Sequence, residues 1–158
     1  MSKKILIVLL GYILLPLSVQ AATGDAIPKS FDVSIGGFDG PNHAVTLTAK
    51  NLSYTYHESS NKNPTPITLT IPNERWIIFK KTLEGLHAEN WQKLCKNPRV
   101  MDGTQWKVHI HFDNYTVDSS GSNSFPTADG SCNNSPEISD DFKKFLNAMS
   151  ELTGKKFE

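Results

Sequence analysis

Two histidines and an aspartate in the segment WKVHIHFDNYTVD have side chains that could bind a metal ion: His109, His111 and Asp118. Polar and apolar residues alternate here, which indicates a β-strand with both histidines on its polar side. A two-residue turn at Asp113-Asn114 would fold the chain back and place His109 opposite Asp118. Imidazole and carboxylate groups are ligands of zinc and copper, so the pattern predicts a metal-binding protein or a metal-dependent enzyme. The alternative is a solvated strand face, on which His109 and Asp118 form a cross-strand polar pair.

Other catalytic patterns are missing from the sequence. It contains no Gly-x-Ser-x-Gly, no His-Glu-x-x-His, no phosphate-binding loop and no dinucleotide fingerprint. Asp140 and Asp141 stand at the expected start of a helix, where the helix dipole explains two carboxylates better than acid–base catalysis does. We therefore expect a non-enzymatic protein without a cofactor and assign no catalytic residue.

The segment GSNSFPTADG contains candidate residues for binding a partner: Ser122, Asn123, Phe125 and Asp129. Long connections without regular structure are often functional, so we expect contacts from residues 119–138 and from the loop 59–66. In the alternative interpretation, the segment is a strand-to-helix connection whose Phe125 packs into the core.

Two cysteines, Cys95 and Cys132, are the only ones in the chain. No Cys-x-x-Cys motif indicates redox chemistry or zinc binding, so we predict a disulfide that pins the polar segment to the end of a helix. Such a bond would close a loop of nearly forty residues, which stabilises a fold by roughly 4 kcal/mol in the chain-entropy model.

The elements that position these residues follow from periodicity. Alternation predicts a strand over 31–35, two strands within 43–58 joined by a turn or bulge at Lys50-Asn51, and a strand over 67–71. Helical spacing predicts a helix that begins at Asn73 as its cap and continues after Gly85 as a bent second piece to residue 94. The hairpin of residues 106–118 follows, and a last helix is capped by Ser139 and ended by Gly154.

These elements predict an α+β fold. We expect two layers, an antiparallel sheet of about five strands packed on two main helices, in the order strands, helix, hairpin, helix. We therefore predict two parts of the chain: a signal peptide over residues 1–21 and a single periplasmic α+β domain over residues 22–158.

The N-terminal residues predict export. Lys3 and Lys4 precede an apolar run over 5–19, and Val19-Gln20-Ala21 offers small residues at a cleavage site. The alternative is an uncleaved membrane anchor, although the run is shorter than a spanning helix needs and contains Pro16. Cleavage would leave 14 basic and 16 acidic residues without a basic cluster. This charge balance argues against binding nucleic acid, and no second apolar run predicts a membrane span.

The segment DGTQWKVHIHFDNYTVDSSGSNSFP, followed by FKKFLNAMSELTG, resembles a family of small bacterial exported domains of uncharacterised function. Their pattern is a Trp-led hairpin, Gly-Ser-Asn, an aromatic-Pro pair and a closing amphipathic helix. The likeness covers roughly residues 102–154, apart from the inserted TADGSCNNSPEIS. The resemblance implies a bacterial, periplasmic setting and transfers no catalytic residue.

Three functions remain open from the sequence. The first is a non-enzymatic binding domain for another periplasmic or secreted protein, such as an inhibitor or immunity protein acting on a toxin or envelope enzyme. The second is a metal-binding protein or metal-dependent enzyme that uses His109, His111 and Asp118. The third is a structural accessory of the cell envelope.

Overall fold

The computed structural model describes residues 26–37, 40–58 and 64–157. The predicted signal peptide and part of the loop 59–66 lie outside these residues. Within the described part of the chain, no helix is both long enough and apolar enough to cross a membrane.

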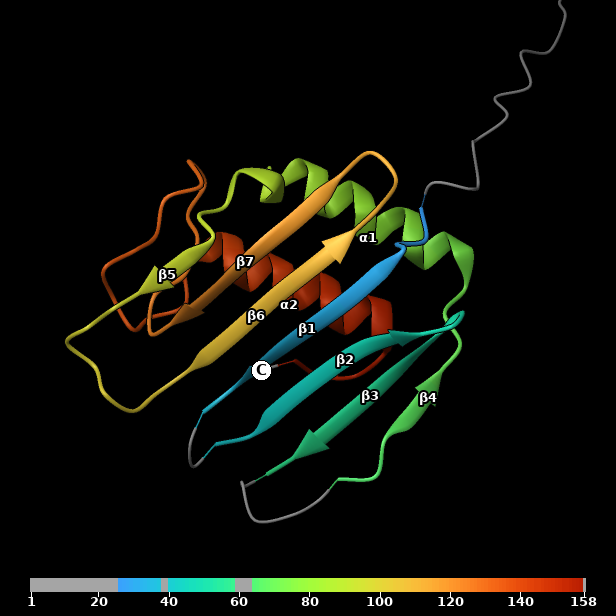
Figure 1. The fold of residues 1–158 in the computed structure, drawn as a ribbon, viewed down its shortest axis with the longest axis horizontal. Helices are drawn as coiled ribbons and strands as arrows, with labels where there is room; N and C mark the ends of the chain where they lie inside the picture. The colour runs from blue at the N-terminus through green and yellow to red at the C-terminus, as the bar shows by residue number, and fades with distance from the viewer. Residues whose placement is uncertain (1–25, 38–39, 59–63, 158) are drawn as a thin grey trace, which may run out of the picture.

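Seven strands form one mixed sheet in the order β4-β3-β2-β1-β6-β7-β5 (Figure 1). All neighbouring strands are antiparallel except β5 and β7, which run parallel. The expectation of about five antiparallel strands is thereby corrected, while the α+β class agrees with the structure. The strands are β1 (Ser30–Gly36), β2 (Asn42–Thr48), β3 (Asn51–His57), β4 (Ile67–Leu69), β5 (Leu94–Lys96), β6 (Gln105–His111) and β7 (Thr116–Ser122).

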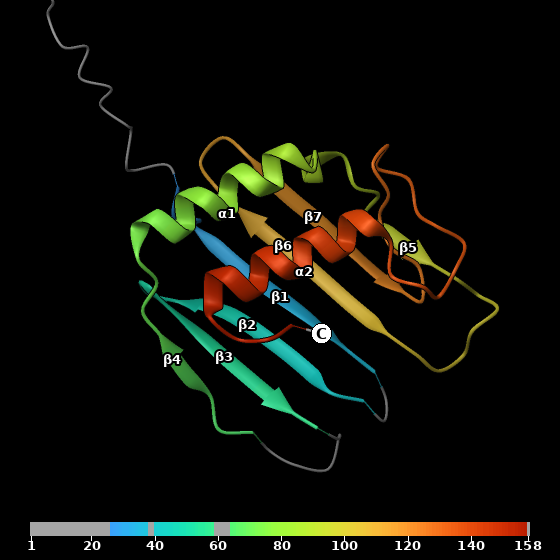
Figure 2. The ribbon, with the colours of Figure 1, turned by 180° about the vertical axis from the view of Figure 1, so that it is seen from behind.

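Two helices, α1 (Asn73–Gly85) and α2 (Asp140–Thr153), lie on the same face of the sheet (Figure 2). Alternation in the strands explains this arrangement, because period-2 side chains point to opposite faces. In β1, for example, Phe31, Val33 and Ile35 are buried, whereas Asp32 and Ser34 are only partly covered. The apolar face and the two helices enclose the core, and the polar face of the strands carries no helix of the described chain.

The predicted continuation of the first helix is wrong. His87 takes a left-handed conformation with φ of 48°, and a short 3-10 helix, η1 (Ala88–Asn90), follows α1. Residues 94–96 then pair with β7 as strand β5 instead of extending the helix. Asn73 is also not a cap: it is the first residue of α1, Pro72 precedes it, and no side chain caps this end.

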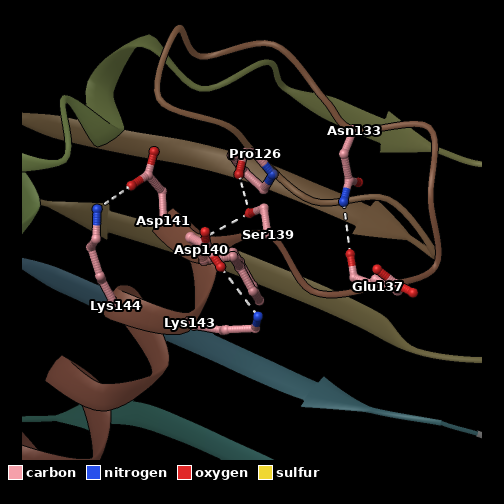
Figure 3. Close-up of polar contacts among 9 residues, drawn as sticks. Pro126, Asn133, Glu137, Ser139, Asp140, Asp141, Lys143 and Lys144 are labelled. Carbon is pink, nitrogen blue, oxygen red and sulfur yellow. Dashed lines mark hydrogen bonds and ion pairs between the residues drawn. The ribbon is translucent and has the colours of Figure 1, made fainter.

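The start of α2 matches its prediction. The hydroxyl oxygen of Ser139 accepts a hydrogen bond from the backbone N–H of Phe142 at 3.2 Å, and Ser139 also donates to the carbonyl of Pro126 (Figure 3). Asp140 and Asp141 occupy the first turn, each paired with a lysine three residues later. At the other end, Gly154 adopts φ of 67° and closes the helix.

The hairpin register is confirmed. His109 is opposite Asp118 and Ile110 is opposite Val117. The earlier turn within residues 43–58 is a hairpin whose strands end at Thr48 and resume at Asn51. Ala49, with φ of 57°, and Lys50 form its loop, one residue before the predicted position.

Candidate functional site on the uncovered face of the sheet

His109 lies in the middle of the polar face, between two carboxylates on neighbouring strands. It is in register with Asp118 on β7 and with Asp32 on β1. Its Nδ1 atom contacts the Asp118 carboxylate, while the Lys107 ammonium lies 2.5 Å from the Asp32 carboxylate. All four side chains are roughly two-fifths exposed. They form two pairs of the surface type, the ion pair of Lys107 with Asp32 and the polar contact of His109 with Asp118. An exposed ion pair stabilises a fold by about 0–1 kcal/mol.

These pairs do not assemble into a metal centre. His111 shares the face with His109 but is in register with Thr116 and Ser30. Among the described residues, no three His, Cys, Asp or Glu side chains form a group that could hold a metal ion. The geometry therefore brings His109 and Asp118 together as a cross-strand pair and leaves His111 outside it.

The same face is hollowed where it meets β5 and the segment 97–104. This hollow, which we call the sheet hollow, has a volume of about 1180 Å³. Polar residues of the central strands contribute to its lining, among them Ser34, Gln105 and Ser120. Along one side it is bounded by residues of β5 and the following segment: Leu94, Lys96, Pro98, Val100 and Met101.

Two large apolar side chains at the sheet hollow are exposed. Leu94 is 63 % exposed and Met101 is 94 % exposed, although side chains of this kind are among those most often buried. Both lie on the side formed by β5 and the segment 97–104, so they place apolar surface beside the polar lining contributed by the central strands.

The charged side chains that line the sheet hollow are basic. Its described lining includes the side chains of Lys96 and Lys107 and contains no aspartate or glutamate. Lys107 is already paired with Asp32. Lys96 is exposed and makes no ion pair with a described residue. The lining therefore favours a negatively charged partner over a positively charged one.

Buried asparagines hold the segment 97–104 in place. The backbone N–H of Asn97 donates to the carbonyl of Ser122 at 2.9 Å, and the Asn97 side chain accepts from the N–H of Arg99 at 3.1 Å. Asn123, which is only 2 % exposed, donates from Nδ2 to the carbonyl of Val100 at 3.3 Å. The segment is thus tied to the end of β7 by hydrogen bonds between residues that are distant in sequence.

The predicted partner-binding residues separate into two groups. Asn123 and Phe125 are buried, and the ring of Phe125 packs on Trp106 and Phe142 with centroids 6.3 and 5.1 Å away. For Phe125 the structure agrees with the alternative interpretation, a strand-to-helix connection whose aromatic ring packs into the core. The buried Asn123 positions the neighbouring segment. Ser122 lines the sheet hollow.

Asp129, the fourth predicted residue, is exposed and lies apart from the sheet hollow. Its carboxylate accepts hydrogen bonds from the hydroxyls of Ser131 and Thr127 at 2.6 and 2.7 Å. These bonds lower the pKa of Asp129 to about 2, because they favour the charged form. Asp129 thus stabilises a local turn.

Cys95 and Cys132 are positioned as a disulfide pair, with Cα atoms 5.5 Å apart. Cys95 is fully buried in β5, while Cys132 lies in the loop that leads to α2. The pair attaches the outermost strand, and with it one side of the sheet hollow, to the loop 126–133.

No family model, curated protein or solved structure matches this chain. The resemblance to small exported bacterial domains therefore stays an expectation, and the function must be argued from the site itself.

The sequence did not reveal Leu94, Lys96 and Met101 as surface residues of one site. A three-residue strand carries too little alternation to be distinguished from the end of a helix. The one available signal was Asn97-Pro98, which marks a break in regular structure and therefore the start of an irregular segment.

Proposed function

We propose that this protein is an exported, non-enzymatic binding domain that holds another protein against the sheet hollow. An inhibitor of a toxin or envelope enzyme, or an immunity protein, would act in this way. Export is supported by the basic and apolar N-terminal residues and by a cysteine pair suited to an oxidising compartment.

The exposure of Leu94 and Met101 beside Lys96 is the observation that carries the proposal. Protein interfaces commonly combine a few apolar anchors with a polar rim. Here Leu94 stands on β5, which pairs with β7, and Met101 stands on the segment that the buried asparagines fix, so little backbone entropy would be lost on binding.

The partner is a protein segment rich in aspartate and glutamate. Lys96, which makes no ion pair with a described residue, supplies positive charge at the sheet hollow, and the described lining contains no carboxylate. The serine and glutamine side chains of the lining would hydrogen-bond to the backbone of such a segment.

Site-specific photo-crosslinking from position 101 tests the proposal. We expect one envelope protein to crosslink in a saturable manner through an acidic segment. In a binding assay with that protein, Leu94→Asp should weaken affinity at least about tenfold, because a carboxylate replaces an apolar anchor near acidic residues.

The matched control is Ile78→Asp, since Ile78 is 55 % exposed on α1, across the sheet. It should leave affinity unchanged. Equal crosslinking from position 78, or an unchanged affinity of the Leu94→Asp variant, would contradict binding at the sheet hollow.

A further inference from the structure

A second cavity lies on the helix-covered face, at the end of β1. It has a volume of about 440 Å³, within the range of small-molecule sites. Side chains from β1, β2, α2 and the segments that flank α2 supply its apolar and aromatic walls: Ile35, Pro41, His43, Ile138, Leu146 and Phe157. We call it the helix-face cavity.

The walls of the helix-face cavity belong to the core. Ile35, His43, Leu146 and Phe157 are each less than a tenth exposed. The ring of Phe157 stacks on His43 with centroids 5.0 Å apart, and His43 Nδ1 lies 3.1 Å from the hydroxyl of Tyr54. Core packing therefore fixes the shape of this cavity before any ligand arrives.

Four glycines contribute to the lining: Gly36, Gly37, Gly40 and Gly103. The side chain of Asn42 lies against Gly36 and donates to the carbonyls of Gly37 and Gly40. Apart from the imidazole of His43, the described lining contains one acidic or basic side chain. It is Asp102, which is exposed. The cavity thus combines an apolar interior with a carboxylate.

We propose that the helix-face cavity binds a small molecule with an apolar ring body and a cationic amine. The ring would occupy the apolar interior, and the amine would lie at Asp102. This cavity adjoins the sheet hollow, because Ile35, Gly36, Gly37 and His43 line both. Leu146 and Phe157 line only the helix-face cavity, whereas Lys107 and Ser120 line only the sheet hollow.

Tryptamine and indole-3-acetate test this assignment, because they share an indole ring and carry opposite charges. Each is titrated into the ¹⁵N-labelled protein while the amide signals of Gly40 and Gly103 are followed, because these two lining glycines do not also line the sheet hollow. We expect saturable shifts of these glycine signals with tryptamine. The dissociation constant of indole-3-acetate should be at least threefold larger than that of tryptamine. In Asp102→Asn this preference should disappear.

Ile138→Trp provides the structural variant, because a larger side chain at this half-buried wall position fills the cavity. It should abolish the glycine shifts, whereas Ile78→Trp on the exposed surface of α1 should retain them. Gly40→Leu is the second occluding variant, since a Cβ atom at Gly40 meets nothing within 4 Å and the fold should tolerate it.

Three results would overturn the assignment. Absence of saturable glycine shifts with tryptamine would exclude this ligand class. Persistence of the shifts in folded Ile138→Trp and Gly40→Leu would place binding elsewhere. Equal or tighter binding of indole-3-acetate would exclude the role of Asp102.

Discussion

Gly121 and Trp106 depend on each other at the end of the β6–β7 hairpin. A Cβ atom at Gly121 would lie 2.5 Å from the Trp106 indole, so the ring can rest there only over a glycine. The indole N–H in turn donates to the carbonyl of Ser124 at 2.8 Å. Phe125 follows directly and packs on the same indole. One residue without a side chain thus permits the chain to turn from β7 into the core.

Gly121→Ala should lower the free energy of unfolding by about 1–3 kcal/mol, because the added methyl group overpacks a fixed indole. Urea denaturation followed by tryptophan fluorescence measures the change. Gly85→Ala is the matched control, since a Cβ atom there meets nothing within 4 Å. It should be neutral or slightly stabilising at the end of α1. Equal destabilisation by both substitutions would contradict the proposed overpacking.

Strand β5 is the element on which the sheet hollow most depends. It has only three residues, yet it carries the exposed Leu94 side chain and leads into the segment that carries Met101. Backbone bonds to β7 and the pairing of Cys95 with Cys132 hold it at the edge of the sheet. A parallel edge strand this short would have little stability of its own.

The double substitution Cys95→Ala/Cys132→Ala should lower the free energy of unfolding by roughly 4 kcal/mol, for a sequence separation of 37 residues. Chemical denaturation of the oxidised protein and of the variant gives this difference. Wild-type protein under reducing conditions serves as the control and should resemble the variant. A reduced protein with the same midpoint as the oxidised one would show that the bond does not constrain the unfolded chain.

Elements with long, regular patterns could be predicted from the sequence, and those held by distant contacts could not. The β6–β7 register followed from alternation on both sides of a two-residue turn, and the cap of α2 followed from Ser139. Strand β5 was missed because its pairing partner lies more than twenty residues later, beyond the reach of a local pattern. At the site, the pairing of His109 with Asp118 was available from the sequence, whereas the grouping of Lys96 with Met101 required the tertiary fold.

The described chain forms one sheet with β1 at its centre, and its helices cover only one of the two faces of the sheet (Figure 2). Strands β2, β3 and β4 extend to one side of β1 in sequence order, and β6 and β7 to the other. Both helices cover the apolar face, and the last described residue, Phe157, is fully buried against it. The opposite face keeps its polar side chains, which leaves room there for the proposed partner.

Hydrogen–deuterium exchange should reflect this arrangement. The amides of β1 and β6 should exchange most slowly, because both strands are paired on two sides over a fully buried core. The amides of β4, a three-residue edge strand, should exchange fastest among the strands. Mass spectrometry of peptides from the intact protein would measure the order. Slow exchange in β4 together with fast exchange in β6 would contradict it.

The central place of the first strand has a consequence as the chain emerges into the compartment where it folds. Strands β1 to β4 form a continuous meander and can pair as soon as they emerge. The other side of β1 has no partner until α1, η1 and β5 have also emerged, because β6 comes after them. Throughout that interval, the emerging chain presents an unpaired strand edge, a template for aggregation. A chaperone that shields this edge would act before β6 emerges.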